Sequence, residues 1–198
     1  LLTAAGYAPM YREHALADPE MHAPAQAVQR VLKAHEPYPA LAVDRHWNMV
    51  ACNRLVPLLL QGLPQPLLGP PLNVLRASLH PQGLAPRIAN LAAWRAHLLH
   101  RLRQQVQATA DAVLAELAEE LRGYAPPQAE PADPLRGDGH VYVPLQLRNG
   151  GGVLNFISTV TVFGTPTDIT LSELALETFF PADEATAGAL HQLARTPA

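Results

Sequence analysis

The hydrophobic periodicity changes twice along this chain, and the order of those changes restricts the fold more than any other feature. A short alternating stretch, ALAVDRHWNMVAC, is followed by a long segment with apolar residues every three or four positions. Alternation then returns from about residue 141. Alternation is typical of half-buried strands, and the wider spacing is typical of amphipathic helices. The sequence therefore predicts one sheet whose strands are separated by a helical insertion.

The first alternating stretch predicts a hairpin with one apolar face and a turn at Asp44 and Arg45. Asn53 follows the hairpin and is expected to cap a short helix over residues 54–60. Ahead of the hairpin, residues 22–35 carry apolar side chains at helical spacing and end before Pro37. They predict a helix that leads into the domain.

The long central segment predicts two helices. The first follows Pro86, and its apolar stripe consists of Leu91, Trp94, Leu98, Leu102 and Val106. Asp111 is expected to start the second helix and Gly123 to end it. The acidic, proline-rich residues 125–138 are expected to form a loop.

Three more strands are predicted over residues 141–148, 153–164 and 169–180, with a closing helix from Asp183 to about Leu193. In the last strand Leu174 and Leu176 face one way, whereas Glu177 shares the other face with Leu171. The order predicts an α+β, PAS-like fold, in which helices cross one face of a five-stranded antiparallel sheet and a cavity lies between them.

Composition narrows the function classes. The length of 198 residues suits a single domain with or without an appendage, and a composition of 48% hydrophobic and only 16% charged residues allows a real core. The net charge of −3 gives no electrostatic reason to expect this portion to bind nucleic acid, for which a basic face is usual. No segment approaches the ~18 apolar residues of a membrane span, so no membrane partner is expected. Cys52 is the only cysteine, is expected to be a small buried thiol, and fits a reducing, cytoplasmic location.

Several segments together resemble the MmyB-like ligand-binding domain of bacterial transcription regulators. They are YPALAVDRHWNMVACN, the Asn-x-x-Arg element in NVLRASLHPQGL, and NLAAWRAHLLHRLRQQ, whose Trp94 stands at the tryptophan of the family. His80 precedes Pro81 where the family commonly has an aspartate. The resemblance covers roughly residues 37–195 and rests on the whole pattern, because no single motif is diagnostic.

The resemblance implies a division of the chain and a role for each part. Residues 1–36 would be the end of an XRE-type helix-turn-helix domain with its linker helix, and residues 37–198 the PAS-like ligand-binding domain. DNA would be contacted only through the missing N-terminal domain. Separately, the low charge, the many leucines and the lone helix over residues 22–35 predict a homodimer with that helix at the interface. The family is associated with fatty-acid-like ligands.

A ligand of that kind predicts an apolar cavity between the sheet and the helix over residues 87–108. Trp47, Trp94 and Phe156 are expected to close it, and Arg76 or Arg101 is expected to hold a carboxylate head group. For each arginine the alternative is a surface charge, and for each aromatic residue it is core packing. The full predicted ligand site is Trp47, Arg76, His80, Trp94, His97, Leu98, Arg101, Phe156 and Phe163.

The sequence predicts no catalytic, metal or cofactor site. It contains no Gly-x-Ser-x-Gly motif, and the glycines at 150–152 lead into a strand rather than a phosphate-binding helix. His97 and His100 are three residues apart on a helix, but no further ligand accompanies them at zinc-like spacing. The predicted function is therefore effector sensing. The alternative is a purely structural dimerisation module with no ligand, and an enzyme is a distant third.

Overall fold

A computed structural model describes residues 22–124, 142–150, 152–162 and 174–195. Within them the strands form one five-stranded antiparallel sheet in the order β2-β1-β5-β4-β3. The strands are β1 (Ala40–Val43), β2 (Met49–Cys52), β3 (Leu145–Asn149), β4 (Gly152–Val162) and β5 (Ala175–Pro181). The predicted α+β, PAS-like fold with five antiparallel strands is confirmed.

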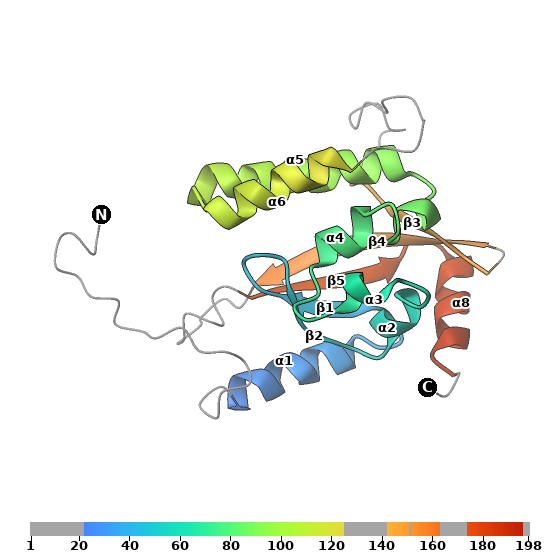
Figure 1. Ribbon diagram of the computed structural model, residues 1–198. Helices are drawn as coiled ribbons and strands as arrows, with labels where there is room; N and C mark the ends of the chain where they lie inside the picture. The colour runs from blue at the N-terminus through green and yellow to red at the C-terminus, as the bar shows by residue number, and fades with distance from the viewer. Residues whose placement is uncertain (1–21, 125–141, 151, 163–173, 196–198) are drawn as a thin grey trace.

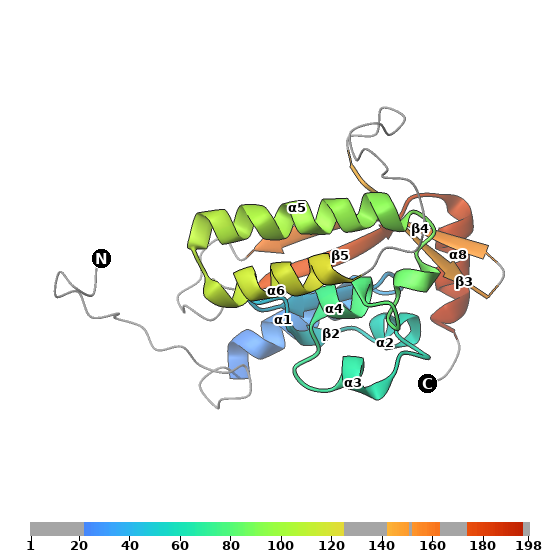
Figure 2. The same cartoon turned by 45° about the horizontal axis from the view of Figure 1, so that its top comes forward.

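The helical insertion covers one face of the sheet, here called the inner face (Figure 1). It comprises the short helices α2 (Leu55–Leu59), α3 (Gln65–Leu68) and α4 (Val74–Leu79), then α5 (Leu91–Thr109) and α6 (Ala112–Gly123). Figure 2 shows α5 and α6 side by side above the sheet. The predicted stripe on α5 faces inward, with Leu91, Trp94, Leu98 and Leu102 all buried.

Two further helices complete the fold. The helix α1 (His22–Ala34) matches the one predicted over residues 22–35 and lies against the opposite, outer face of the sheet (Figure 1). The closing helix α8 (Glu184–Leu193) begins at Asp183, whose side chain accepts a hydrogen bond from the Thr186 amide at 2.7 Å. Asp111 caps α6 in the same way, as predicted, by accepting from the amides of Val113 and Leu114.

Some details of the sequence prediction were wrong. The strand expected from residue 141 starts at Leu145 instead, because Pro144 has no amide hydrogen to donate to a sheet ladder. The short helices α3 and α4 were not predicted, although Asn73 caps α4 by accepting a hydrogen bond from the Arg76 amide at 3.1 Å. The predicted start of the last strand, at residue 169, lies outside the described residues.

Alternation along β1 divides the core into two clusters. Leu41 and Val43 belong to the large cluster on the inner face. Ala40 and Ala42 belong to a smaller outer cluster, where Val28 and Leu32 of α1 cover them together with Leu174 and Leu176. The small alanine side chains let α1 approach the strand closely. The linker-like helix is therefore part of the folded body.

Asn53 joins α1 to the sheet by hydrogen bonds. It is 5% exposed, and its amide nitrogen donates to the carbonyl oxygens of Leu32 and Tyr38 at 3.2 and 2.8 Å. Its side-chain oxygen accepts from the amides of Ala40 and Leu55. The second of these bonds lies at the start of α2, whose N-cap residue is Arg54 and not the predicted Asn53, and the other bonds fix the end of α1.

Candidate functional site

An apolar cavity of about 90 Å³ lies between the inner face of the sheet and the helical insertion. Leu41 of β1 and Phe179 of β5 form its floor, and Ala77 of α4 with Trp94 and Leu98 of α5 lies opposite. Among the described lining residues, Ser78 and Glu177 are the polar ones. The cavity therefore suits an apolar group far better than a sugar or a nucleotide.

Trp94, which lines the apolar cavity, and His97 lie next to each other on α5. The indole nitrogen of Trp94 donates to the Ser78 hydroxyl at 3.1 Å, so this serine is already hydrogen-bonded to another residue that lines the cavity. The His97 ring lies against the Trp94 ring, with centroids 5.6 Å apart. Burial and the charge of Arg101 lower the pKa of His97, which favours a neutral imidazole at neutral pH.

Glu177 is the charged residue at the cavity, and Arg101 is its partner. Glu177 is only 7% exposed, and its Oε1 accepts a hydrogen bond from Nη1 of Arg101 at 2.9 Å. Burial raises the pKa of Glu177, although the arginine opposes that effect. Arg101 also lies over the Trp47 ring, 4.6 Å from its centroid. One ion pair thus links β5, α5 and the β1–β2 turn.

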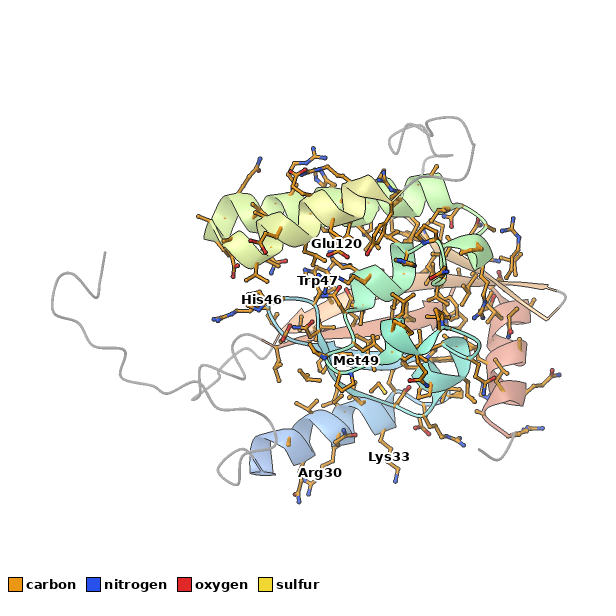
Figure 3. All side chains as sticks on the ribbon, viewed as in Figure 1. Arg30, Lys33, His46, Trp47, Met49 and Glu120 are labelled. Carbon is orange, nitrogen blue, oxygen red and sulfur yellow. The ribbon has the colours of Figure 1, made fainter. Side chains whose placement is uncertain are left out.

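Trp47 lies beside a second hollow, of about 320 Å³, which is also lined by Arg101, Gln105 and Val162. Figure 3 shows Trp47 next to His46 at the hairpin turn. Trp47 has a left-handed backbone, with φ of 68°, and its indole nitrogen donates to Gln105 at 2.8 Å. The turn is fixed by Asp44, whose side chain accepts from the amides of His46 and Asn48.

Arg76 and His80 lie away from the cavity. Arg76 forms a bidentate ion pair with Glu120 of α6, labelled in Figure 3, with N–O distances of 2.7–3.0 Å. This pair lowers the pKa of Glu120, and burial with the nearby Glu120 raises the pKa of Tyr124 to about 12. His80 accepts a hydrogen bond from the Gln82 amide and places its ring against Tyr124. These residues join α4 to α6.

Phe156 is fully buried in the large core cluster, with its ring 6.1 Å from that of Phe179. Phe179, rather than Phe156, is the aromatic residue of the sheet that lines the cavity. Phe163 lies outside the described residues.

Cys52 is half-buried on β2, and burial raises the pKa of its thiol. In the described part of the chain, no three His, Cys, Asp or Glu side chains converge as metal ligands would.

The structure thus brings Trp94, Leu98 and, through Glu177, Arg101 together at the cavity, with His97 and Trp47 adjacent. The sequence prediction omitted Glu177 and Phe179 from the site. The signal was mixed, because they lie on the opposite side of the strand from Leu174 and Leu176, on the side that Glu177 shares with Leu171. An acidic residue on an inward-facing strand position indicates either a functional group or a buried ion pair.

The profile of the MmyB-like transcription regulator ligand binding domain matches residues 24–193. The chain belongs to this family. A search of curated proteins finds no match. The matched segment includes nearly all of α1 and extends through α8, so it spans both faces of the sheet.

Membership of the MmyB-like family makes this chain a ligand-sensing regulatory domain, and the family is not an enzyme family. In this MmyB-like domain, the apolar cavity and the Arg101–Glu177 pair beside it are the strongest candidates for the sensing site. Within the described residues, no helix has the length and apolarity needed to cross a membrane.

Proposed function

We propose that this domain senses a fatty-acid-like, amphipathic small molecule in the apolar cavity, and that it does so as the dimeric sensor of a DNA-binding regulator. The observation that carries the proposal is the lining of the cavity, which is almost wholly aliphatic and aromatic. A hydrocarbon chain gains about 0.8 kcal/mol for each methylene that it buries in such surroundings. Arg101, next to the cavity, supplies a cation for a carboxylate head group.

The volume of the cavity suggests how binding produces a signal. About 90 Å³ is well below the ~300–1,000 Å³ of sites that enclose drug-sized ligands. A long chain therefore requires a wider arrangement of α5 and the sheet. A ligand that binds this wider arrangement shifts the population toward it, and the shift is the proposed signal to the DNA-reading part of the full protein.

The proposal is tested by identifying what the purified domain carries and what it binds. The domain is extracted with organic solvent, the extract is analysed by mass spectrometry, and the stripped protein is screened against lipids by thermal shift. We expect a co-purified amphiphile or a concentration-dependent stabilisation by straight-chain carboxylates. A clean extract with no thermal shift across the panel contradicts the proposal.

The small cavity volume also favours a second candidate, a structural dimerisation module with no ligand. In that case the cavity is residual space in a core that is otherwise filled, and Arg101 with Glu177 is a buried structural ion pair. The same screen separates the two candidates, because a structural module gives no stabilisation with any amphiphile.

Dimerisation through α1 is the next part of the proposal. Val28 and Leu32 are already used against the sheet, and Val31 is the apolar residue of α1 that is exposed, at 44%. Deleting residues 1–35 would uncover Ala40 and Ala42, so a surface substitution is the cleaner test. We expect Val31→Glu to convert the dimer to a monomer by light scattering, whereas Arg30→Glu, on an exposed position of the same helix (Figure 3), leaves it dimeric. A dimer that persists in Val31→Glu moves the interface to the sheet edge or α8.

DNA binding is assigned to the full-length protein and not to this domain. The net charge of −3 gives the domain no overall attraction to phosphates. A gel-shift titration with the operator of the full-length protein checks this assignment. We expect no specific complex with the domain alone, and nanomolar binding by it contradicts the assignment.

A further inference from the structure

The Arg101–Glu177 ion pair lies between two separate spaces. Glu177 lines the apolar cavity of about 90 Å³, and Arg101 lines the hollow of about 320 Å³ beside Trp47. The two side chains meet through one contact, Nη1 to Oε1 at 2.9 Å, and not through the two parallel bonds that arginine and carboxylate often form. The ion pair is therefore a partition between the two spaces: Glu177 borders the apolar cavity, and Arg101 borders the larger hollow.

The partition conflicts with a carboxylate ligand. Glu177 is the charged residue among the described residues that line the apolar cavity, and its charge has the same sign as that of a carboxylate head group. It also occupies Nη1 of Arg101, the nitrogen by which the arginine reaches the lining of the cavity. A second carboxylate on the same guanidinium favours the neutral form of the buried Glu177.

We propose that Glu177 is an internal counter-ion that holds Arg101 in the ligand-free domain, and that a ligand carboxylate replaces it on Arg101 while Glu177 takes up a proton from the solvent. The exchange breaks the Nη1–Oε1 bond, forms an equivalent bond from Arg101 to the ligand, and leaves Glu177 as a neutral acid. This inference rests on the proposed function. It makes the ligand a monocarboxylate whose binding is coupled to one proton.

Replacement of Glu177 also joins the two spaces. The acyl chain then occupies the widened apolar cavity, and the carboxylate lies toward the larger hollow, on Arg101. Together the two volumes reach the lower part of the range for enclosed ligand sites. The stacking of Arg101 on Trp47 holds the guanidinium in place when Glu177 leaves it.

The surroundings of Glu177 favour its neutral form once Arg101 is engaged elsewhere. Burial already raises the pKa of Glu177, and Arg101 is the charge that opposes this effect. From the neighbouring strands Glu177 is paired with Leu41 and Val160, which do not ionise. Its other titratable surroundings on α5 are His97, which interacts with Arg101, and His100, which interacts with His97. Asp44 and Arg45 line the second hollow together with Arg101.

The test compares decanoate with decanol by isothermal titration calorimetry at pH 7.5, in phosphate and in Tris, two buffers with different ionisation enthalpies. For the unmodified domain we expect decanoate binding to take up close to one proton and decanol binding to take up none. Glu177→Gln keeps an oxygen for Arg101 and removes the charge. It should bind decanoate about ten-fold more tightly, with no proton uptake, because the protonation cost is gone.

Glu120→Gln is the matched control, because it neutralises the other glutamate that is paired with a candidate arginine, away from the cavity. It should leave both the affinity and the proton uptake unchanged. Binding of decanoate and decanol without proton uptake overturns the counter-ion role and leaves the proposed function standing. So does a Glu177→Gln variant that binds decanoate no more tightly while binding decanol normally. Absence of binding by either compound overturns the proposed function, and this inference with it.

Discussion

The two faces of the sheet are built from different side chains. On the outer face, Ala40 and Ala42 allow α1 to lie directly on the strand, and Leu32 is completely buried there. On the inner face, larger side chains such as Leu41, Trp94 and Phe179 keep the helices further away and leave about 90 Å³ between them. Small residues let a helix pack closely on the sheet, whereas large residues of unequal shape leave a cavity. The outer face therefore holds α1 in place, and the inner face has space for a ligand.

The largest effect that tests this comparison is expected from truncating one leucine on each face. Leu32→Ala should lower the free energy of unfolding by about 4 kcal/mol, because it removes a fully enclosed side chain. Leu98→Ala should cost only about 2 kcal/mol, because that side chain already borders empty space and loses fewer contacts. Urea denaturation measures both values. Equal losses would mean that the two faces are packed alike.

A smaller effect is expected from adding volume. Ala42→Leu places a larger side chain under α1 and should lower the free energy of unfolding by about 2 kcal/mol. Leu98→Phe projects into the cavity and should change stability by less than about 1 kcal/mol, while abolishing the thermal shift with decanoate. A large destabilisation by Leu98→Phe, measured by the same denaturation assay, would contradict the presence of usable space on the inner face.

The smallest effect is a pH dependence of opposite sign at two glutamates. Burial raises the folded-state pKa of Glu177, so its contribution to stability is lost as the pH rises above its ordinary value of 4.5. Glu177→Gln should therefore gain stability relative to the unmodified domain between pH 4 and pH 7. Arg76 lowers the pKa of Glu120, whose contribution is present above 4.5 and lost as the pH falls through its lowered pKa.

Glu120→Gln should accordingly lose stability at neutral pH relative to the unmodified domain, and the loss should disappear in acid. Thermal denaturation of both variants across this pH range gives the comparison. If the two variants respond in the same direction, the inner face does not desolvate Glu177 in the way described.

Much of the fold was predictable because its signals are local. The alternation of Leu41 and Val43, the stripe from Leu91 to Leu102 and the caps Asp111 and Asp183 each involve neighbours within a few residues. The six-residue helix α4 was missed because it is too short to display a periodic stripe. The start of β3 was missed because alternation continues through Pro144, although the ladder does not.

The site was less predictable because its contacts are distant in sequence. Arg76 and Arg101 look equivalent in the sequence, since both lie in apolar stretches of the helical insertion. The difference between them is the acid that lies opposite: Glu120 is 44 residues from Arg76, and Glu177 is 76 residues from Arg101. Only the packing of α6 on α4 and of α5 on the sheet decides which arginine lies beside the cavity.

The strand β1 belongs to both faces, and this has a mechanical consequence. Leu41 is in the wall of the cavity, and Ala42, the next residue, lies beneath α1. Successive side chains of a strand share one stiff backbone, so no loop or free rotamer between them absorbs a displacement. The strand therefore moves as one rigid element, so a ligand that displaces Leu41 also displaces Ala42 beneath α1. The distance that β1 moves, and not a chain of side-chain contacts, limits how far a bound ligand can move α1.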